Sequence, residues 1–163
     1  MNTNEKIIEI LKQHPEGGET FFNALDLMLR SDFDILAELK ELIRKNVNNP
    51  KNVNLILTGH FGISLINREN IWLYKFKNFY LFQGGLRGDD KGEFLMDFKN
   101  DNSDCILVDD SLYSGTTRDK INILLRQKGF IGITSTFVIY DGSPTVDENV
   151  HSLFKYYDKT NVI

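Results

Sequence analysis

The spacing of apolar residues predicts that the first fifty residues are mainly helical. Residues 4–13 carry isoleucine and leucine at helical spacing, which predicts a short amphipathic helix, and the proline and two glycines that follow end it. Residues 20–30 predict a second helical segment with a broad apolar face. A stronger helix begins near Asp32 or Asp34, and the polar, asparagine-rich residues 46–54 form a connection after it.

Short apolar runs alternate with helical patterns in the rest of the chain. Residues 55–57 predict a buried strand, with a helix from Ile63 onward. The aromatic residues 71–82 predict one long strand, or two strands joined around Lys77 and Asn78. Further on, the pattern predicts a strand at 94–98, a turn at 100–103, a strand from Cys105, a helix over 118–128 that Gly129 ends, a strand at 131–140 and a short helix at 150–157. Strands that alternate with helices imply a largely parallel sheet with right-handed crossovers.

Length and composition indicate one ordinary globular domain over residues 1–163, with 41% hydrophobic and 26% charged residues. The net charge of −4 argues against general nucleic-acid binding, which needs a basic face. The single cysteine, Cys105, excludes an internal disulfide framework and is expected to be a buried thiol. The first six residues lack the apolar core of a signal peptide, and no apolar run reaches membrane-spanning length. We therefore expect a cytoplasmic protein with no membrane partner.

The most informative segment joins an apolar strand to two acids and a small-residue turn. Residues 105–108 are apolar and end in the adjacent carboxylates Asp109 and Asp110. A hydroxyl- and glycine-rich turn follows, made of Ser114, Gly115, Thr116 and Thr117, and a helical pattern begins after it. This order places acids and backbone N–H groups at the carboxyl end of a strand, where open α/β folds bind ligands.

The chemistry of this turn points to a phosphate. Small residues let the backbone curl so that successive N–H groups face one anion, and the following helix adds the positive end of its dipole. Two carboxylates beside a phosphate would repel it unless they meet hydroxyl groups or a bound Mg²⁺ instead. A ribose 5-phosphate, which has a phosphate at one end and vicinal hydroxyls beside it, satisfies both requirements.

The segment from Cys105 to Thr117 resembles the phosphoribosyl-pyrophosphate (PRPP) signature of the type I phosphoribosyltransferases. The resemblance implies that Asp109 and Asp110 contact the 2′- and 3′-hydroxyls of the ribose and lie at the Mg²⁺ site, and that residues 113–117 wrap the 5′-phosphate. Tyr113 is bulky at a position where small residues are commoner, although some uracil-type and pyrimidine-regulatory relatives carry a similar Leu-Tyr-Thr-Gly. The family fold is a mostly parallel, twisted sheet flanked by helices, with a small variable hood and a flexible hairpin loop.

Other sites also place two aspartates at the end of a strand. Response-regulator receivers and Walker B strands do so, but the chain has no P-loop to accompany a Walker B strand. A phosphatase with an aspartyl nucleophile needs two aspartates separated by one residue, whereas Ser111 follows the pair here. A receiver-like domain would be phosphorylated at Asp109 or Asp110 and would need a lysine after the last strand.

A second glycine-containing connection follows the first predicted strand and begins with Thr58, Gly59 and His60. In phosphoribosyltransferases the corresponding loop holds the pyrophosphate of PRPP, so the resemblance makes these three residues substrate-binding candidates. His60 either donates to the pyrophosphate or caps the turn. The alternative for the whole segment is a plain connection between a strand and a helix.

Residues 83–93 resemble, by position, the flexible loop that closes over the active site in this family. Cations on such a lid would stabilise the charge that grows on the leaving pyrophosphate and would exclude water. Arg87 is the first candidate for this catalytic role and Lys91 the second, and Lys75 and Lys77 could reach the same phosphates. The alternative is a solvated hairpin tip.

Recognition of the base is expected in a hood built partly from the helical segment 1–50. Residues 15–18 together with Phe21, Phe22 and Leu25 loosely resemble the opening of adenine-type enzymes, and residues 140–142 lie where relatives place base contacts. The sequence does not identify the base.

The resemblance therefore implies a phosphoribosyltransferase that moves the ribose 5-phosphate group from PRPP to a nitrogenous base and releases pyrophosphate, with Mg²⁺ as cofactor. The alternative is a non-catalytic regulatory module that binds PRPP or a nucleotide. The aromatic residues 71–82 would suit the interface of a homodimer.

Overall fold

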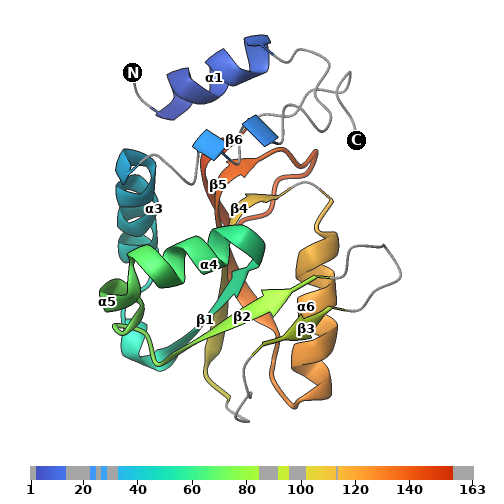
Figure 1. The fold of residues 1–163 in the computed structure, drawn as a ribbon. Coiled ribbons are helices and arrows are strands. Elements are labelled where there is room, and N and C mark those ends of the chain that lie inside the picture. Colours follow the sequence, from blue (N-terminus) through green and yellow to red (C-terminus); the bar gives the residue numbers. More distant parts are fainter. Residues whose placement is uncertain are drawn as a thin grey trace.

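A six-stranded sheet organises the computed structural model (Figure 1). The structure describes residues 3–13, 23–24, 27–28, 33–84, 92–95, 102–112 and 114–155. Its strands are β1 (Val53–Thr58), β2 (Asn78–Gln83), β3 (Glu93–Phe94), β4 (Asp104–Leu112), β5 (Ile133–Asp141) and β6 (Val150–Lys155). Its helices are α1 (Thr3–Gln13), α3 (Phe33–Asn46), α4 (Gly59–Arg68), α5 (Asn70–Leu73), α6 (Thr116–Gln127) and the 3₁₀ turn η1 (Pro50–Asn52).

The sheet is parallel except at one edge. Its order is β3-β2-β1-β4-β5-β6, and β3 alone among these described strands pairs antiparallel. The mostly parallel α/β architecture expected from the sequence is confirmed. Among the described residues, no helix is long and apolar enough to cross a membrane.

Both faces of the sheet are buried, because alternate strand residues point into two separate cores. One core joins Leu55, Leu57, Ile106 and Val108 of the strands to helical residues that include Ile7, Leu39 and Leu65. The other joins Ile56 and Leu107 to Ile121 and Leu125 of α6. Figure 1 shows α3 and α4 on one side of the sheet and α6 on the other. Each aliphatic side chain buried in this way contributes about 1.5–3 kcal/mol to folding.

The prediction of strand structure throughout residues 71–82 is wrong in its first half. Helix α5 covers Asn70–Leu73, and β2 begins only at Asn78. Trp72 in α5 and Phe76 in the turn that follows it pack edge to face, with ring centroids 5.2 Å apart, so the chain folds back on itself here instead of extending as a strand. High aromatic content favours strands on average, but here the packing of Leu73 and Phe76 into the core decides.

The short helix predicted at 150–157 is also wrong, because residues 150–155 form the strand β6. This strand pairs parallel with β5, and two ring pairs join the strands: Phe137 stacks on His151 at 4.9 Å, and Tyr140 stacks on Phe154 at 5.7 Å. Cross-strand pairing therefore overrides the weak local preference.

The remaining predicted helices and strands agree with the structure in part. Helix α6 matches the predicted helix, and Gly129, at φ +88°, ends it as expected. Helix α4 begins at Gly59 rather than at Ile63. Of the helical segment 20–30, residues 23–24 and 27–28 are helical and the rest lies outside the described residues. Much of the predicted strand 94–98 and turn 100–103 also lies outside them.

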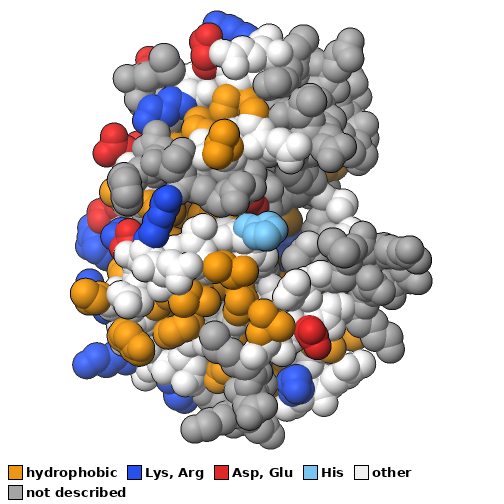
Figure 2. All heavy atoms as spheres, viewed as in Figure 1, with side chains coloured by type: hydrophobic (Ala, Val, Ile, Leu, Met, Phe, Trp, Pro, Cys, Tyr) orange, Lys and Arg blue, Asp and Glu red, His pale blue; other side chains and the backbone are white. Residues whose placement is uncertain are grey.

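Apolar side chains gather on the face formed by α4, α5 and β2 (Figure 2). Ile63, Ile71 and Tyr74 are among the exposed large hydrophobic residues there. A homodimer through this region stays a prediction.

Helix α4 lies unusually close to the strands beneath it because of Gly62. A Cβ atom at Gly62 would lie 2.8 Å from Leu81 Cδ1, 3.0 Å from Leu57 Cβ and 3.2 Å from the Leu57 carbonyl carbon. Two of these three atoms belong to the rigid part of β1. The close approach sets where the amino end of α4 sits at the edge of the sheet.

We expect Gly62→Ala to destabilise the protein by about 1–3 kcal/mol, since overpacking outweighs the gain in helix propensity of about 1 kcal/mol. Gly84→Ala is the matched control, because the nearest atom of the described residues to its Cβ would be Phe82 Cε1, at 3.7 Å. Urea denaturation of both variants checks the expectation. Equal stability of the two variants would show that α4 can move away from the sheet at little cost.

Candidate functional site

The carboxyl ends of the central strands bring the predicted site residues together. Because β1 and β4 are parallel and in register, with Leu57 opposite Val108, Thr58 and Asp109 follow side by side at the same edge of the sheet. Two adjoining cavities of about 260 and 370 Å³ open there. Both are lined by Asp109, Asp110, Ser111 and Thr117, so the acidic pair lies between them.

The acidic pair belongs to β4 itself and does not follow it. The strand continues to Leu112, and Asp109 and Ser111 pair with Val138 and Tyr140 of β5. The Asp109 carboxylate accepts a hydrogen bond from the backbone N–H of Asp110 at 2.8 Å, and the Ser111 hydroxyl donates to Asp110 Oδ1 at 3.2 Å. The ladder with β5 therefore holds both carboxylates in fixed positions.

The environment disfavours the charge on Asp109. Burial, and then the neighbouring charge of Asp110, raise the pKa of Asp109 well above its ordinary value, although the Thr58 hydroxyl acts in the opposite direction by hydrogen bonding. A cation beside the pair would relieve this repulsion. Two adjacent carboxylates are a donor set that fits Mg²⁺, which proteins commonly hold with one or two carboxylates, water and the phosphates of a substrate.

The turn before α6 has the form of an anion site. Gly115 precedes the helix in a left-handed conformation (φ +78°) and has no side chain to cap the helix start. The first N–H groups of a helix lack intrahelical partners; that of Thr116 makes a long hydrogen bond of 3.4 Å to the Ser114 hydroxyl, and the next N–H groups can bind a ligand. The exposed hydroxyls of Ser114 and Thr116 lie 2.8 Å apart and add further donors. Tyr113, a predicted phosphate contact, lies outside the described residues.

The second predicted connection is shorter than the sequence pattern indicated. Strand β1 passes directly into α4 through Gly59, which has φ +54°. His60 is exposed, lines the larger cavity and makes no hydrogen bond within the described part of the chain, so it does not cap the helix. Thr58, Gly59 and His60 thus face the acidic pair across this cavity. Its described lining residues include neither lysine nor arginine.

The two lysines before the predicted lid, which were expected to reach the same phosphates, lie away from the acidic pair. Lys77 precedes β2 at the opposite edge of the sheet, where its ammonium donates to the Ser103 hydroxyl at 2.9 Å. Lys75 lines a separate cavity beside α3 and Trp72. Neither can reach a ligand at Asp109, because Asp109 lies toward the carboxyl ends of the strands and the length of a strand separates these from the amino ends. The lid candidates Arg87 and Lys91, and the hood residues at 15–18, 21, 22 and 25, lie outside the described residues.

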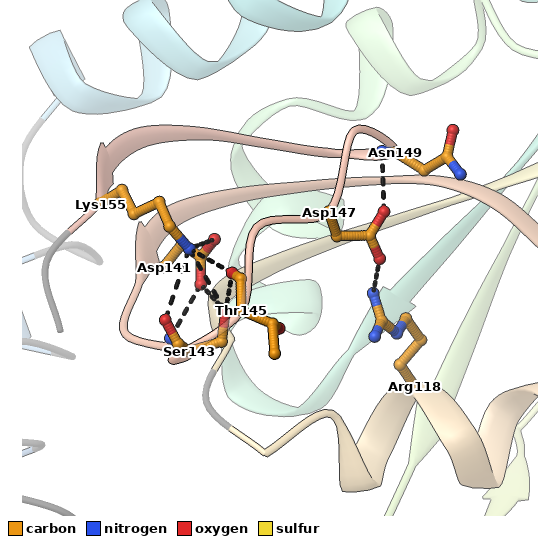
Figure 3. Close-up of polar contacts among 7 residues, drawn as sticks. All are labelled: Arg118, Asp141, Ser143, Thr145, Asp147, Asn149 and Lys155. Carbon is orange, nitrogen blue, oxygen red and sulfur yellow. Dashed lines mark hydrogen bonds and ion pairs between the residues drawn. The ribbon is translucent and has the colours of Figure 1, made fainter.

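The structure adds Arg118 to the predicted site and gives Asp141 contacts that the sequence pattern did not predict. Arg118, on the first turn of α6, lines the smaller cavity and pairs with Asp147 at 3.4 Å (Figure 3). Asp141, a residue of the segment where base contacts were expected, is buried, and its carboxylate accepts hydrogen bonds from Lys155 Nζ at 2.9 Å and from the Ser143 hydroxyl at 2.6 Å. These contacts hold the connection between β5 and β6. No local pattern marks the pairs of Arg118 with Asp147 and of Lys155 with Asp141, because their partners come from different segments.

Comparison with known proteins identifies the fold. No family model and no curated protein matches the sequence. Among solved structures, the chain is similar to an adenine phosphoribosyltransferase from Rhodothermus marinus, at a TM-score of 0.56 and 11% identity, covering 77% of this chain and 81% of that one. It is also similar to an orotate phosphoribosyltransferase from Aeropyrum pernix, at 0.55 and 14%, covering 78% and 75%. A purine phosphoribosyltransferase from Pyrococcus horikoshii matches at 0.53 and 17%, covering 78% and 83%. The chain therefore has the phosphoribosyltransferase type I fold, and its structural neighbours include purine and pyrimidine enzymes.

The raised pKa of Asp109 predicts a cost in stability. For a carboxyl whose pKa is higher in the folded than in the unfolded state, stability falls as pH rises between those two values, because the unfolded state loses its proton first. Asp109→Asn keeps the acceptor oxygen but removes the charge. We expect it to raise the free energy of unfolding at pH 7.5 by about 1 kcal/mol. The gain should be smaller at pH 5.

Urea denaturation at both pH values measures this effect, with Asp104→Asn as the matched control. Asp104 is exposed at the opposite end of the same strand, so its substitution should change stability by less than about 0.5 kcal/mol. A loss of stability in Asp109→Asn at pH 7.5 would contradict the repulsion described for the pair.

Proposed function

We propose that the protein transfers the 5-phosphoribosyl group from PRPP to a nitrogenous base and releases pyrophosphate. The observation that carries the proposal is the placement of the acidic pair between two cavities, with the turn at residues 114–117 on one side and Thr58, Gly59 and His60 on the other. A molecule with a phosphate, vicinal hydroxyls and a pyrophosphate in that order matches the arrangement.

Each part of the site has a role in this proposal. The N–H groups and hydroxyls at residues 114–117 bind the 5-phosphate, and the two carboxylates accept hydrogen bonds from the ribose hydroxyls. Thr58 and His60 hold the pyrophosphate end. The bond between C1 of the ribose and the pyrophosphate oxygen breaks, a base nitrogen bonds to C1, and the base loses a proton.

Catalysis then comes from orientation and electrostatics, without a protein nucleophile. Positive charge develops on the ribose ring as the bond to pyrophosphate breaks, and the carboxylates of Asp109 and Asp110 stabilise it. Mg²⁺, held by this pair, would neutralise charge on the leaving pyrophosphate. Proteins usually hold Mg²⁺ with one or two carboxylates, and substrate phosphates and water supply the other ligands.

A regulatory module that binds PRPP without turning it over is a second candidate. One observation favours it: the described lining of the larger cavity contains no lysine or arginine to stabilise a leaving pyrophosphate. Calorimetric titration with PRPP, with and without Mg²⁺, followed by a pyrophosphate-release screen over purine and pyrimidine bases, separates the candidates. Mg²⁺-dependent binding with release for one base supports the transferase, and binding without release for any base supports the module.

Asp110→Asn tests the site directly. Loss of the charged acceptor should weaken PRPP binding or lower kcat/KM by roughly tenfold to a hundredfold, the value of one or two charge-assisted hydrogen bonds. Asp119→Asn removes the same charge from the first turn of α6 but lines neither cavity, so it should leave binding within about twofold. Wild-type behaviour of Asp110→Asn would refute the assignment of the ribose site.

A further inference from the structure

We propose that Arg118 is a ligand-binding residue for the 5-phosphate and that Asp147, from the connection between β5 and β6, positions it. The inference rests on the proposed function, since it assigns the phosphate of that ligand to the turn at residues 114–117. It names two residues outside the acidic pair and the turn, drawn from segments far apart in the sequence.

Arg118 places a positive charge in the smaller cavity. Among the described residues that line the smaller cavity, Arg118 is the only cation, and it shares the cavity with Asp109, Asp110 and the hydroxyls of the turn. Helix N–H groups and hydroxyls can bind an anion, but the two carboxylates oppose it. A guanidinium within the cavity offsets that repulsion on the side where the phosphate would lie.

The guanidinium of Arg118 extends from Asp147 to the turn before α6. One end of it, Nη1, pairs with Asp147 Oδ2 at 3.4 Å. The other end lies over the turn: Nη2 is 3.4 Å from the position that a Cβ atom of Gly115 would take. The pair with Asp147 is the only hydrogen bond of the Arg118 side chain within the described residues, so the donors at Nη2 and Nε are available to a ligand.

Backbone hydrogen bonds within the connection hold Asp147 in place. Its second carboxylate oxygen accepts the backbone N–H of Asn149 at 2.9 Å, and its carbonyl accepts the N–H of Val150 at 3.1 Å. Figure 3 shows Asp147 directed at Arg118 from the strand connection, whose other end is fastened by Lys155. Lys155 donates to Asp141 at 2.9 Å and to the Thr145 carbonyl at 2.8 Å.

A purely structural ion pair explains these contacts less well. The side chains of Arg118 and Asp147 are 26% and 40% exposed, and pairs this accessible contribute only about 0–1 kcal/mol to stability. The backbone already ties the start of this connection to the end of β4, because the N–H of Gly142 donates to the carbonyl of Leu112 at 2.8 Å. The orientation of the free end of the guanidinium toward the turn is accounted for by an anion.

Calorimetric titration with ribose 5-phosphate tests the proposal. Arg118→Gln should weaken binding by about tenfold or more, the effect of one charge-assisted hydrogen bond, and Asp147→Asn should weaken it by about twofold to fivefold because the guanidinium loses its orientation. Arg126→Gln is the matched control, because it removes the same charge from the exposed end of α6 and lines neither cavity. In a turnover assay, the Arg118 variant should raise KM for PRPP with little change in kcat, since the phosphate is remote from the bond that breaks.

Arg118→Lys gives a second reading, because it keeps the charge without the fork of donors, and it should bind between wild type and Arg118→Gln. Affinity of Arg118→Gln within twofold of wild type, or an equal loss in Arg126→Gln, would overturn the inference while transferase activity could stand. Arg118-dependent binding without pyrophosphate release for any base would support the inference and refute the proposed transfer. A wild-type protein that binds neither ribose 5-phosphate nor PRPP would refute both.

Discussion

The parallel pairing of β1 with β4 is the constraint on which the site depends. In this register Leu57 lies opposite Val108, so the two strands deliver Thr58 and Asp109 to the same edge of the sheet. Both strands are buried on two faces, and a slip of one residue would turn Leu55, Leu57, Ile106 and Val108 away from their core. The hydrophobic core therefore sets the distance between the two sides of the cleft, and core residues such as Leu107 and Phe82 form part of the cavity walls.

Repulsion between the two carboxylates at the carboxyl ends of the strands lowers the stability of the free protein and also favours ligands that relieve it. Two adjacent carboxylates, one of them with a raised pKa, sit beside a turn whose N–H groups attract anions. The Asp110 N–H and the Ser111 hydroxyl donate to these carboxylates, but no cation in the part of the chain that the structure describes pairs with them to offset the repulsion between the two acids. A ligand that brings hydroxyls to the acids and a phosphate to the turn satisfies both, so the destabilising features of the free protein become binding interactions.

The connection between β5 and β6 is a distinctive part of this chain. Parallel neighbours usually need a crossover of a dozen or more residues, often a helix, whereas only residues 142–149 separate these two strands. So short a return depends on side-chain anchors. Asp141, buried and bonded to Lys155, fastens one end, and Asp147 faces α6 near the other. The same anchors bring this connection to the start of α6, beside the turn at residues 114–117 that we propose as the phosphate site.

The sequence by itself determined the local part of the site. An apolar strand, an acidic pair, a small-residue turn and a helix follow one another between residues 105 and 127, and each step depends on side chains within a few positions, so the pattern was readable without a structure. The same reasoning failed for residues 71–77 and 150–155, where aromatic and β-branched residues suit a strand or a helix and the neighbouring elements decide. Only the tertiary structure joined Arg118 to Asp147, which lies 29 residues away, and Lys155 to Asp141, which lies 14 away. Such pairs leave no periodic signal, because the partners meet through the order of the strands and not through the spacing of residues along the chain.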